Sequence, residues 1–253
     1  MLAKILTGTG LKITLGIGLT VFGGLLLAWI ISFLKPKIAL KEALGAVLVV
    51  FAFGVLSLVL GVTLLKYRQQ WILCWLLGIA LLLMLTVLSF FRDPERSAKV
   101  NEGDVFSPAD GVVDLIDEAA EIPGIPGKAK RISIFLSLFN VHVQRAPVAG
   151  KITKIEHVKG KVLPAFLGES SEKNRHNVYY MEGEIPVVIK QISGIIAQRP
   201  VSWVKSGQQL GIGERLGLIK FGSRVDIYLP AKCELLVDVD SKVKGGLTKI
   251  AKY

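Results

Sequence analysis

A serine with nucleophilic potential stands at a turn-like position in the last quarter of the chain. Ser223 follows Gly222 between two apolar runs. Glycine has no Cβ, so the backbone can bend there until the serine hydroxyl reaches the preceding carbonyl. A serine hydroxyl is a weak nucleophile unless a base takes its proton. A Gly-Ser step is also common in proteins, and taken alone it carries no functional information.

His142 is the best placed of the three histidines to act as such a base. It follows the strongly apolar run 132–139, at a point where a strand would end and a site can open. A lone histidine in this position is more often a structural group than a catalyst. His157 lies in a charged run and is expected to be solvated. The residues themselves leave both interpretations of His142 open.

Two further polar stretches could serve a site. The Ser-Pro-Ala-Asp-Gly stretch 107–111 indicates a turn before a strand, and the carboxylate of Asp110 could orient a histidine. The loop that contains Asn174, Arg175 and His176 could present its cationic side chains to an anionic head group. Each stretch can equally be a turn with no chemical role.

Several other classes of protein are not supported by the sequence. The two cysteines, Cys74 and Cys233, do not have the spacing of a disulfide scaffold or a metal site, so no metal is expected. The glycine-rich stretch 211–217 lacks the strand–loop–helix context of a dinucleotide-binding loop. The net charge is +11, but residues 92–253 carry no basic stripe with interleaved aromatic residues. Nucleic acid is therefore not an expected partner.

The elements that must position these residues divide the chain into two parts. Residues 1–91 contain three runs without a charged side chain: 13–34, 43–65 and 71–91. Each exceeds the roughly 18–20 apolar residues that cross a bilayer, so we expect three transmembrane helices. A signal peptide followed by buried helices is the alternative. The segment carries +6 of the net charge. We expect it to lie in the cell membrane, and the distribution of basic residues between its loops predicts that residues 92–253 face the cytoplasm.

Residues 92–253 are expected to form a predominantly β soluble domain of barrel or sandwich type, with few short helices. Residues 92–101 are polar and predict a linker, and residues 163–173 are the helix candidate. Short runs rich in Val and Ile alternate with polar residues, as half-buried strands do, and Gly and Pro separate them. These strand candidates are 112–116, 131–136, 151–158, 187–192, 216–221, 225–229 and 235–239.

The order and spacing of the motifs resemble the phosphatidylserine decarboxylases, membrane enzymes with a self-made pyruvoyl group. The resemblance covers about residues 90–230, and its Phe-Gly-Ser-Arg sequence is similar to the short subfamily. It is carried by four stretches in order: Phe-Phe-Arg-Asp-Pro-Glu-Arg at 90–96, Ser-Pro-Ala-Asp-Gly at 107–111, Asn-Val-His-Val-Gln-Arg-Ala-Pro at 140–147 and Ile-Lys-Phe-Gly-Ser-Arg-Val at 219–225.

The resemblance implies a proenzyme that cleaves itself between Gly222 and Ser223. The products would be chains 1–222 and 223–253, which stay together in one fold, and Ser223 would become the covalent pyruvoyl cofactor. His142 would be the base for this cleavage. Asp110 would hold the imidazole tautomer, as in a Ser-His-Asp triad.

The resemblance also implies the conversion of phosphatidylserine to phosphatidylethanolamine with release of carbon dioxide. The pyruvoyl carbonyl would act as the electron sink, and His142 is the best candidate proton donor. The expected partners are a serine phospholipid, the membrane and the two cleavage products with each other. A homodimer is left open.

Two positions depart from the family pattern. Arg145 stands where some members carry a second histidine, so His142 would serve both cleavage and decarboxylation. The residues Asn174, Arg175 and His176 stand where the family often has Asn-Glu-Arg, which puts a head-group role of this loop in doubt. The alternatives are a pyruvoyl decarboxylase of another aminated lipid head group, such as archaetidylserine, and a non-catalytic membrane-anchored module similar to lipoyl carrier barrels.

Overall fold

The computed structural model describes residue 55 and residues 70–161, 173–194, 200–220 and 223–253. The apolar runs expected at 13–34 and 43–65 lie outside the described residues, apart from Val55. The helix expected at 163–173 also lies outside them, apart from Lys173.

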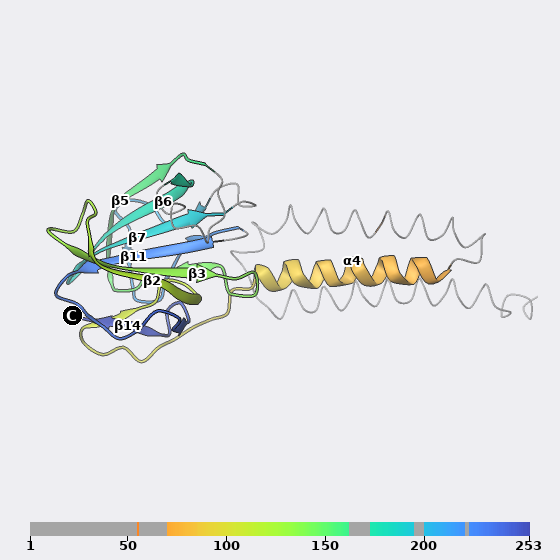
Figure 1. Cartoon of the computed structure of the whole chain (residues 1–253), viewed down its shortest axis with the longest axis horizontal. Helices are drawn as coiled ribbons and strands as arrows, with labels where there is room; N and C mark the ends of the chain where they lie inside the picture. The colour runs from red at the N-terminus through yellow and green to blue at the C-terminus, as the bar shows by residue number, and fades with distance from the viewer. Residues whose placement is uncertain (1–54, 56–69, 162–172, 195–199, 221–222) are drawn as a thin grey trace, which may run out of the picture.

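Helix α4 (Gln70–Phe90) coincides with the third apolar run and projects from the β domain (Figure 1). Its sequence is almost entirely apolar, with no acidic residue in its first turn and no basic residue in its last. Within the described ranges, no helix has the combined length and hydropathy expected of a membrane-crossing helix.

The part of the chain that follows α4 is mainly β, as the sequence predicts, and its strands pair antiparallel. The described strands are β1 (Asp104–Phe106), β2 (Gly111–Ala120), β3 (Ala129–Leu136), β4 (Val143–Arg145), β5 (Gly150–Val158), β6 (His176–Glu182), β7 (Pro186–Ser193), β8 (Val201–Ser202), β9 (Gln209–Leu210), β10 (Arg215–Leu218), β11 (Ser223–Pro230), β12 (Glu234–Leu235), β13 (Lys242–Val243) and β14 (Lys249–Lys252).

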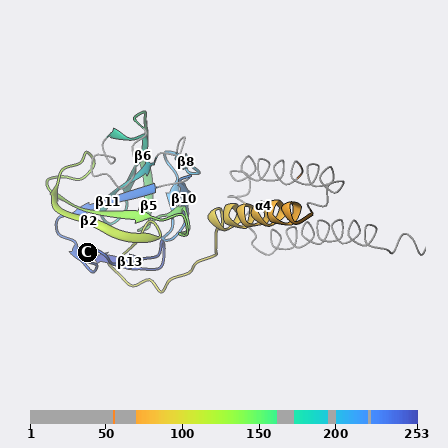
Figure 2. The same cartoon turned by 45° about the vertical axis from the view of Figure 1, so that its right-hand side comes forward.

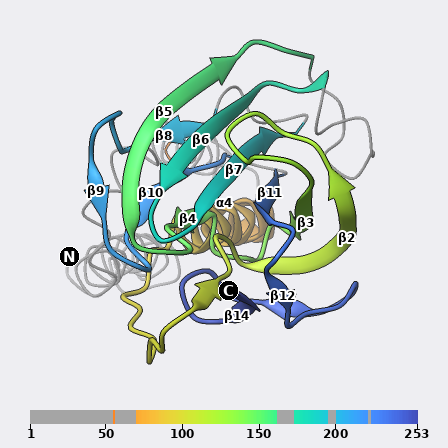
Figure 3. The same ribbon diagram turned by 90° about the vertical axis from the view of Figure 1, so that its left-hand side faces the viewer.

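Eight of these strands form one strongly curved sheet in the order β13-β2-β3-β11-β7-β6-β5-β9. Figure 3, which looks along α4, shows this sheet wrapping round as a half-barrel. Two three-stranded sheets, β4-β10-β8 and β1-β14-β12, accompany it. The β8 and β10 strands lie at the end of the domain that faces α4 (Figure 2).

The main hydrophobic core lies on the inner face of the large sheet. Strand β11 shows why: its side chains alternate with period two, so Val225, Ile227 and Leu229 point into the core and are fully buried. Arg224 and Asp226 lie between them on the opposite face. The two faces of one central strand therefore carry an apolar core and a polar cluster.

Gly111 at the start of β2 lets two backbones approach closely. A Cβ at this position would lie 2.2 Å from the carbonyl oxygen of Phe135 on β3, so any side chain would force the strands apart. The backbone N–H of Arg145 also donates to the carbonyl of Pro108 at 2.9 Å. The turn 107–111 is thereby held beside both β3 and β4.

Candidate active site

Strand pairing brings His142 and Ser223 to the same end of the domain. The last residue of β3, Leu136, is the register partner of Ser223, the first residue of β11. After a short turn the chain enters β4, and the backbone N–H of Ile219 donates to the carbonyl of His142 at 3.3 Å. Ile219 precedes Ser223 by four positions. Ile219 and Ser223, on either side of this short segment, are therefore held by His142 and by the end of β3.

The His142 ring is fully buried and is held in one orientation. Its centroid lies 3.9 Å from that of Phe90, at an interplanar angle of 32°. Its Nδ1 lies 3.0 Å from the carbonyl oxygen of Asn140. A carbonyl only accepts, so the neutral ring carries its proton on Nδ1 and a lone pair on Nε2. Among the described residues, Nε2 has no hydrogen-bond partner, as a general base awaiting a substrate requires.

Burial sets the charge state of His142. Desolvation of the imidazolium lowers the pKa of His142 from 6.5 to about 4, and the nearby Arg92 acts in the same direction. The hydrogen bond to Asn140 and the negative charge of Asp110 oppose this shift only in part. The imidazole is therefore neutral at neutral pH and able to accept a proton.

Asp110 is buried, and the structure pairs it with Arg96 rather than with His142. Arg96 donates from Nη1 and Nη2 to the two carboxylate oxygens at 2.5 and 2.9 Å, and the backbone N–H of Gly245 donates at 2.8 Å. The planar guanidinium matches both oxygens at once, which favours this arrangement. No hydrogen bond joins Asp110 to His142 among the described contacts, although the charge of Asp110 acts on the His142 pKa.

The predicted cleavage site is described only in part. Gly222 and the side chain of Ser223 lie outside the described residues, whereas the backbone of Ser223 pairs with Leu136 on one side and Ser193 on the other. The role of this bond therefore stays a prediction. Ser223 itself stands at the head of β11, between two neighbouring strands.

The loop proposed to meet a head group lies one strand away from Ser223. The Asn174 amide donates to the Ser193 carbonyl at 2.8 Å, and the backbone N–H of Ser193 donates to the Arg175 carbonyl at 3.0 Å. His176 Nδ1 contacts the Asn174 carbonyl at 2.6 Å, and burial lowers the pKa of His176. Asn174 and His176 are buried, and the Asn174 amide ties the loop to the end of β7, whereas the Arg175 side chain is exposed.

Arg145, at the position where some relatives carry a histidine, binds the linker that follows α4. Its Nη2 donates to Asp93 Oδ1 at 2.8 Å and to the Pro94 carbonyl at 2.8 Å. Arg215 Nε donates to the other oxygen of Asp93 at 2.5 Å. Burial lowers the pKa of Arg145, and the negative charge of Asp93 opposes this. Arg145 therefore fastens the linker to the β domain.

Sequence reasoning missed Arg96 and Asn140 as neighbours of the site. Both belong to stretches that carry the family resemblance, at 90–96 and 140–147, and that membership is the signal that could have singled them out. Their partners, Asp110 and His142, lie 14 and 2 residues away along the chain. Only the fold shows which atoms meet.

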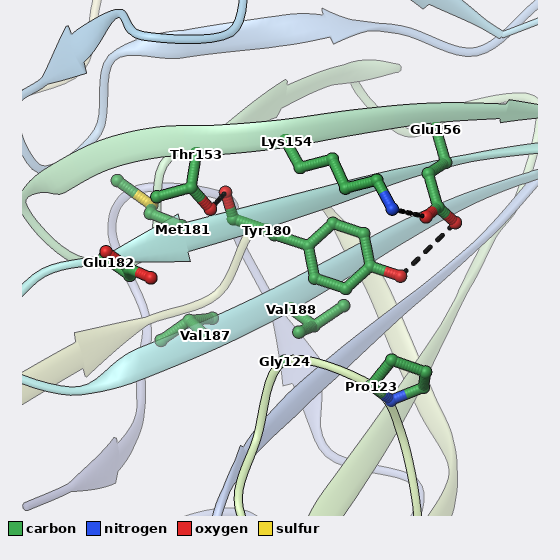
Figure 4. Close-up of a pocket in the computed structure, with 10 residues that line it drawn as sticks. All are labelled: Pro123, Gly124, Thr153, Lys154, Glu156, Tyr180, Met181, Glu182, Val187 and Val188. Atoms are coloured by element: carbon green, nitrogen blue, oxygen red, sulfur yellow. Dashed lines mark hydrogen bonds and ion pairs between the residues drawn. The ribbon is translucent and has the colours of Figure 1, made fainter.

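A separate pocket of about 490 Å³ opens elsewhere in the domain (Figure 4). Within it Lys154 Nζ lies 2.5 Å from Glu156 Oε1, and the Tyr180 hydroxyl donates to Glu156 Oε2 at 3.3 Å. None of the predicted site residues lines it. Its lining is Pro123, Gly124, Thr153, Lys154, Glu156, Tyr180, Met181, Glu182, Val187 and Val188.

Comparison with known proteins agrees with the arrangement of the motifs. The family model for phosphatidylserine decarboxylase matches residues 83–251. The phosphatidylserine decarboxylase proenzyme of Carboxydothermus hydrogenoformans is 45% identical over 180 residues, which cover 70% of this chain and 84% of the relative. The proenzyme of Parabacteroides distasonis is 37% identical over 216 residues, or 84% of this chain and 97% of the relative. The chain belongs to the phosphatidylserine decarboxylase family.

Proposed function

We propose that this protein is a phosphatidylserine decarboxylase proenzyme, which converts phosphatidylserine to phosphatidylethanolamine and releases carbon dioxide. The observation that carries the proposal is the extent of the family match. It covers residues 83–251 and so spans Asp110, His142 and Ser223. The buried, neutral His142 beside the chain that leads into Ser223 supports the same conclusion.

Maturation begins at the peptide bond between Gly222 and Ser223. The Ser223 hydroxyl oxygen attacks the Gly222 carbonyl carbon while Nε2 of His142 takes the hydroxyl proton. The carbon–nitrogen bond breaks, the proton passes to the freed nitrogen, and Gly222 becomes an ester on Ser223. Elimination then releases the Gly222 carboxylate, and water replaces the nitrogen, which leaves as ammonia. The remaining residue 223 is a pyruvoyl group.

The residues around the head of β11 fit such a group. Ser223 is paired on both sides, so a carbonyl group formed there stays attached to a fixed strand. Nε2 of His142 is buried and has no partner among the described residues, so it can hold a proton for the reaction. A pyruvoyl group supplies the electron sink for the pair that carbon dioxide leaves behind. His142 gives a proton back to the former α-carbon, and the exposed Arg175 attracts the anionic head group.

Membrane association is part of the proposal, because the substrate is a lipid. Helix α4 exposes large apolar side chains, including Trp75 and Leu82. Leu138 and Phe139, in the turn between β3 and β4, are 51% and 80% exposed. Arg92 Nη2 joins this turn to the end of α4 by donating to the Phe139 carbonyl at 2.5 Å. Apolar side chains next to a cation are suited to the boundary of an anionic leaflet. The loop charges favour the cytoplasmic side of the cell membrane.

Intact mass analysis of the purified protein tests the proposal. We expect two chains, residues 1–222 and residues 223–253, the second with a blocked pyruvoyl N-terminus. Ser223→Ala should abolish cleavage and carbon dioxide release from phosphatidylserine vesicles together, because no pyruvoyl group can form. A single uncleaved chain in an active preparation would overturn the mechanism. Activity on archaetidylserine but not on phosphatidylserine would instead overturn the substrate.

A further inference from the structure

The turn that precedes His142 has a role that is separate from the chemistry of the ring. We infer that Asn140, and not Asp110, is the positioning residue that fixes the tautomer of His142. The inference rests on the proposed role of His142 as a base. It deepens that role by naming the group that decides which ring nitrogen is free to act.

Asn140 closes the turn with both its side chain and its backbone. Asn140 Oδ1 accepts hydrogen bonds from the Ser137 backbone N–H at 2.8 Å and from the Ser137 hydroxyl at 2.7 Å. The backbone N–H of Asn140 donates to the Ser137 carbonyl at 3.0 Å. These three bonds fix the peptide plane whose carbonyl then accepts from Nδ1 of His142 at 3.0 Å. An asparagine side chain that bonds nearby backbone is an established way to lock a turn.

The turn and the ring are also held from both sides. Arg92 donates to the Phe139 carbonyl inside the turn, and Phe90 packs against the imidazole. On the other side, Gln144 Nε2 donates to the His142 carbonyl at 2.8 Å, and Gln191 Nε2 donates to Gln144 Oε1 at 2.7 Å. Gln144 and Gln191 are completely buried, so this chain of amides is shielded from water.

Asp110 binds groups other than His142, and a carboxylate on Nδ1 would change the charge of the imidazole ring. Its carboxylate oxygens accept from Arg96 and Gly245. A carboxylate bound to Nδ1 would stabilise the imidazolium strongly, because it carries a full negative charge. A carbonyl selects the same tautomer with a smaller preference for the charged form. Asn140 therefore keeps Nε2 available without charging the ring.

The test measures the tautomer directly and does not depend on catalysis. The chain has three histidines, so histidine-selective ¹⁵N labelling gives few signals to assign. In the full chain carrying Ser223→Ala, which stays uncleaved, we expect His142 to show a protonated Nδ1 and an unprotonated Nε2 at pH 7. Adding Asn140→Ala should produce a mixture of tautomers, whereas adding Asp110→Asn should leave the tautomer unchanged.

The same substitutions are then made in the cleavable chain. Asn140→Ala removes two hydrogen bonds that hold the turn, so self-cleavage should slow by roughly ten- to thirtyfold. Asn140→Asp keeps an oxygen acceptor for Ser137 and should restore most of the rate. Ser137→Ala removes one of the two bonds and should give an intermediate rate.

The two proposals fail in different ways. If Asp110→Asn scrambles the His142 tautomer while Asn140→Ala leaves it intact, the positioning role of Asn140 is refuted, even if cleavage proceeds as proposed. If the tautomers behave as expected but His142→Ala cleaves and decarboxylates normally, the proposed base is wrong instead. The melting temperature of each variant identifies any that fails to fold. If Asn140→Ala fails to fold, Asn140→Asp is compared with the parent chain in its place.

Discussion

His142 combines two properties that a surface histidine does not have together. The ring is fully buried against Phe90, and a backbone carbonyl rather than an acid contacts its Nδ1. Burial favours the neutral form, and the carbonyl directs the lone pair to Nε2. The residue is therefore ready to accept a proton without first losing one.

The neutral state of His142 predicts a pH-dependent stability. Burial lowers the pKa of His142 from 6.5 to about 4, so between these values the unfolded chain binds a proton that the native chain does not. The free energy of unfolding should therefore fall by about 3 kcal/mol as the pH drops from 6.5 to 4, and this contribution should be constant above pH 7. Melting curves of Ser223→Ala, with and without His142→Gln, measure it.

The Ser223→Ala chain and the Ser223→Ala, His142→Gln chain serve as controls for each other in this measurement. Both retain His157 and His176 and differ only at His142, so other titrating groups contribute equally. We expect the His142→Gln chain to lose less stability in acid than its parent. Parallel losses in the two chains would show that His142 is not held neutral.

Candidate residues for the site could be chosen from the sequence, but their hydrogen-bond partners could not. His142 and Asp110 could be selected because each follows or precedes an apolar run at a turn. The partner of Asp110 could not, since nothing in the local pattern around either residue indicates that Arg96 reaches it. The orienting group of His142 is a main-chain carbonyl, which every residue possesses. A sequence pattern therefore could not distinguish it.

At the scale of elements, most of the long strands were predicted, and the two-residue strands β8 and β9 were not. The runs 131–136 and 225–229 lie within β3 and β11, where the alternation of a half-buried strand extends over several residues. Strands such as β8 and β9 contain two residues each and are defined by their neighbours rather than by a pattern of their own. Strand β6 was missed, because its polar first residues, His176 and Asn177, indicated a loop.

The stretch 92–101 was expected to be only a linker, but its first part is fastened to the β domain. Asp93 is almost completely buried between Arg145 and Arg215. Arg96 reaches Asp110, and the N–H of Asn101 donates to Asp104 Oδ2 at 2.8 Å. Alternation of apolar and polar residues could not reveal this docking, because it depends on charges from distant strands. The end of α4 is consequently tied to the candidate site.

Breaking the buried contact of the linker should destabilise the protein. Asp93→Ala leaves two guanidinium groups without their shared carboxylate, one of them buried, and should lower the free energy of unfolding by about 3 kcal/mol. Glu95→Ala is the matched control, because Glu95 contacts the same Arg215 at 3.0 Å but has an 85% exposed side chain. It should change stability far less than Asp93→Ala does, because solvent screens an exposed ion pair. Equal losses for the two variants in chemical denaturation would contradict the docking role of Asp93.

At the scale of the whole molecule, the proposed cleavage separates a central strand from the rest of its sheet. Strand β11 lies between β3 and β7, with eight register partners on one side and six on the other. Strand β14, near the C-terminus, also pairs with β1 at the start of the domain. The smaller product is therefore bound on several sides by the larger one.

This arrangement predicts that cleavage makes stability depend on concentration. Unfolding of the cleaved protein separates two chains, whereas unfolding of Ser223→Ala does not. A tenfold dilution should lower the melting temperature of the cleaved protein by about 3–6 °C and leave that of Ser223→Ala unchanged. Identical behaviour of the two proteins on dilution would mean that the chains are not separated when the fold is lost.

Because β11 is a central strand, the proposed maturation requires that the sheet fold before the chain is cleaved. Before cleavage, closing the sheet round this strand is an intramolecular event, assisted by the chain that joins β10 to β11. Afterwards the same sheet can be rebuilt only if two separate molecules meet. The two chains of the mature protein would then reassemble poorly after unfolding. Each molecule would therefore fold efficiently only once, before its cleavage.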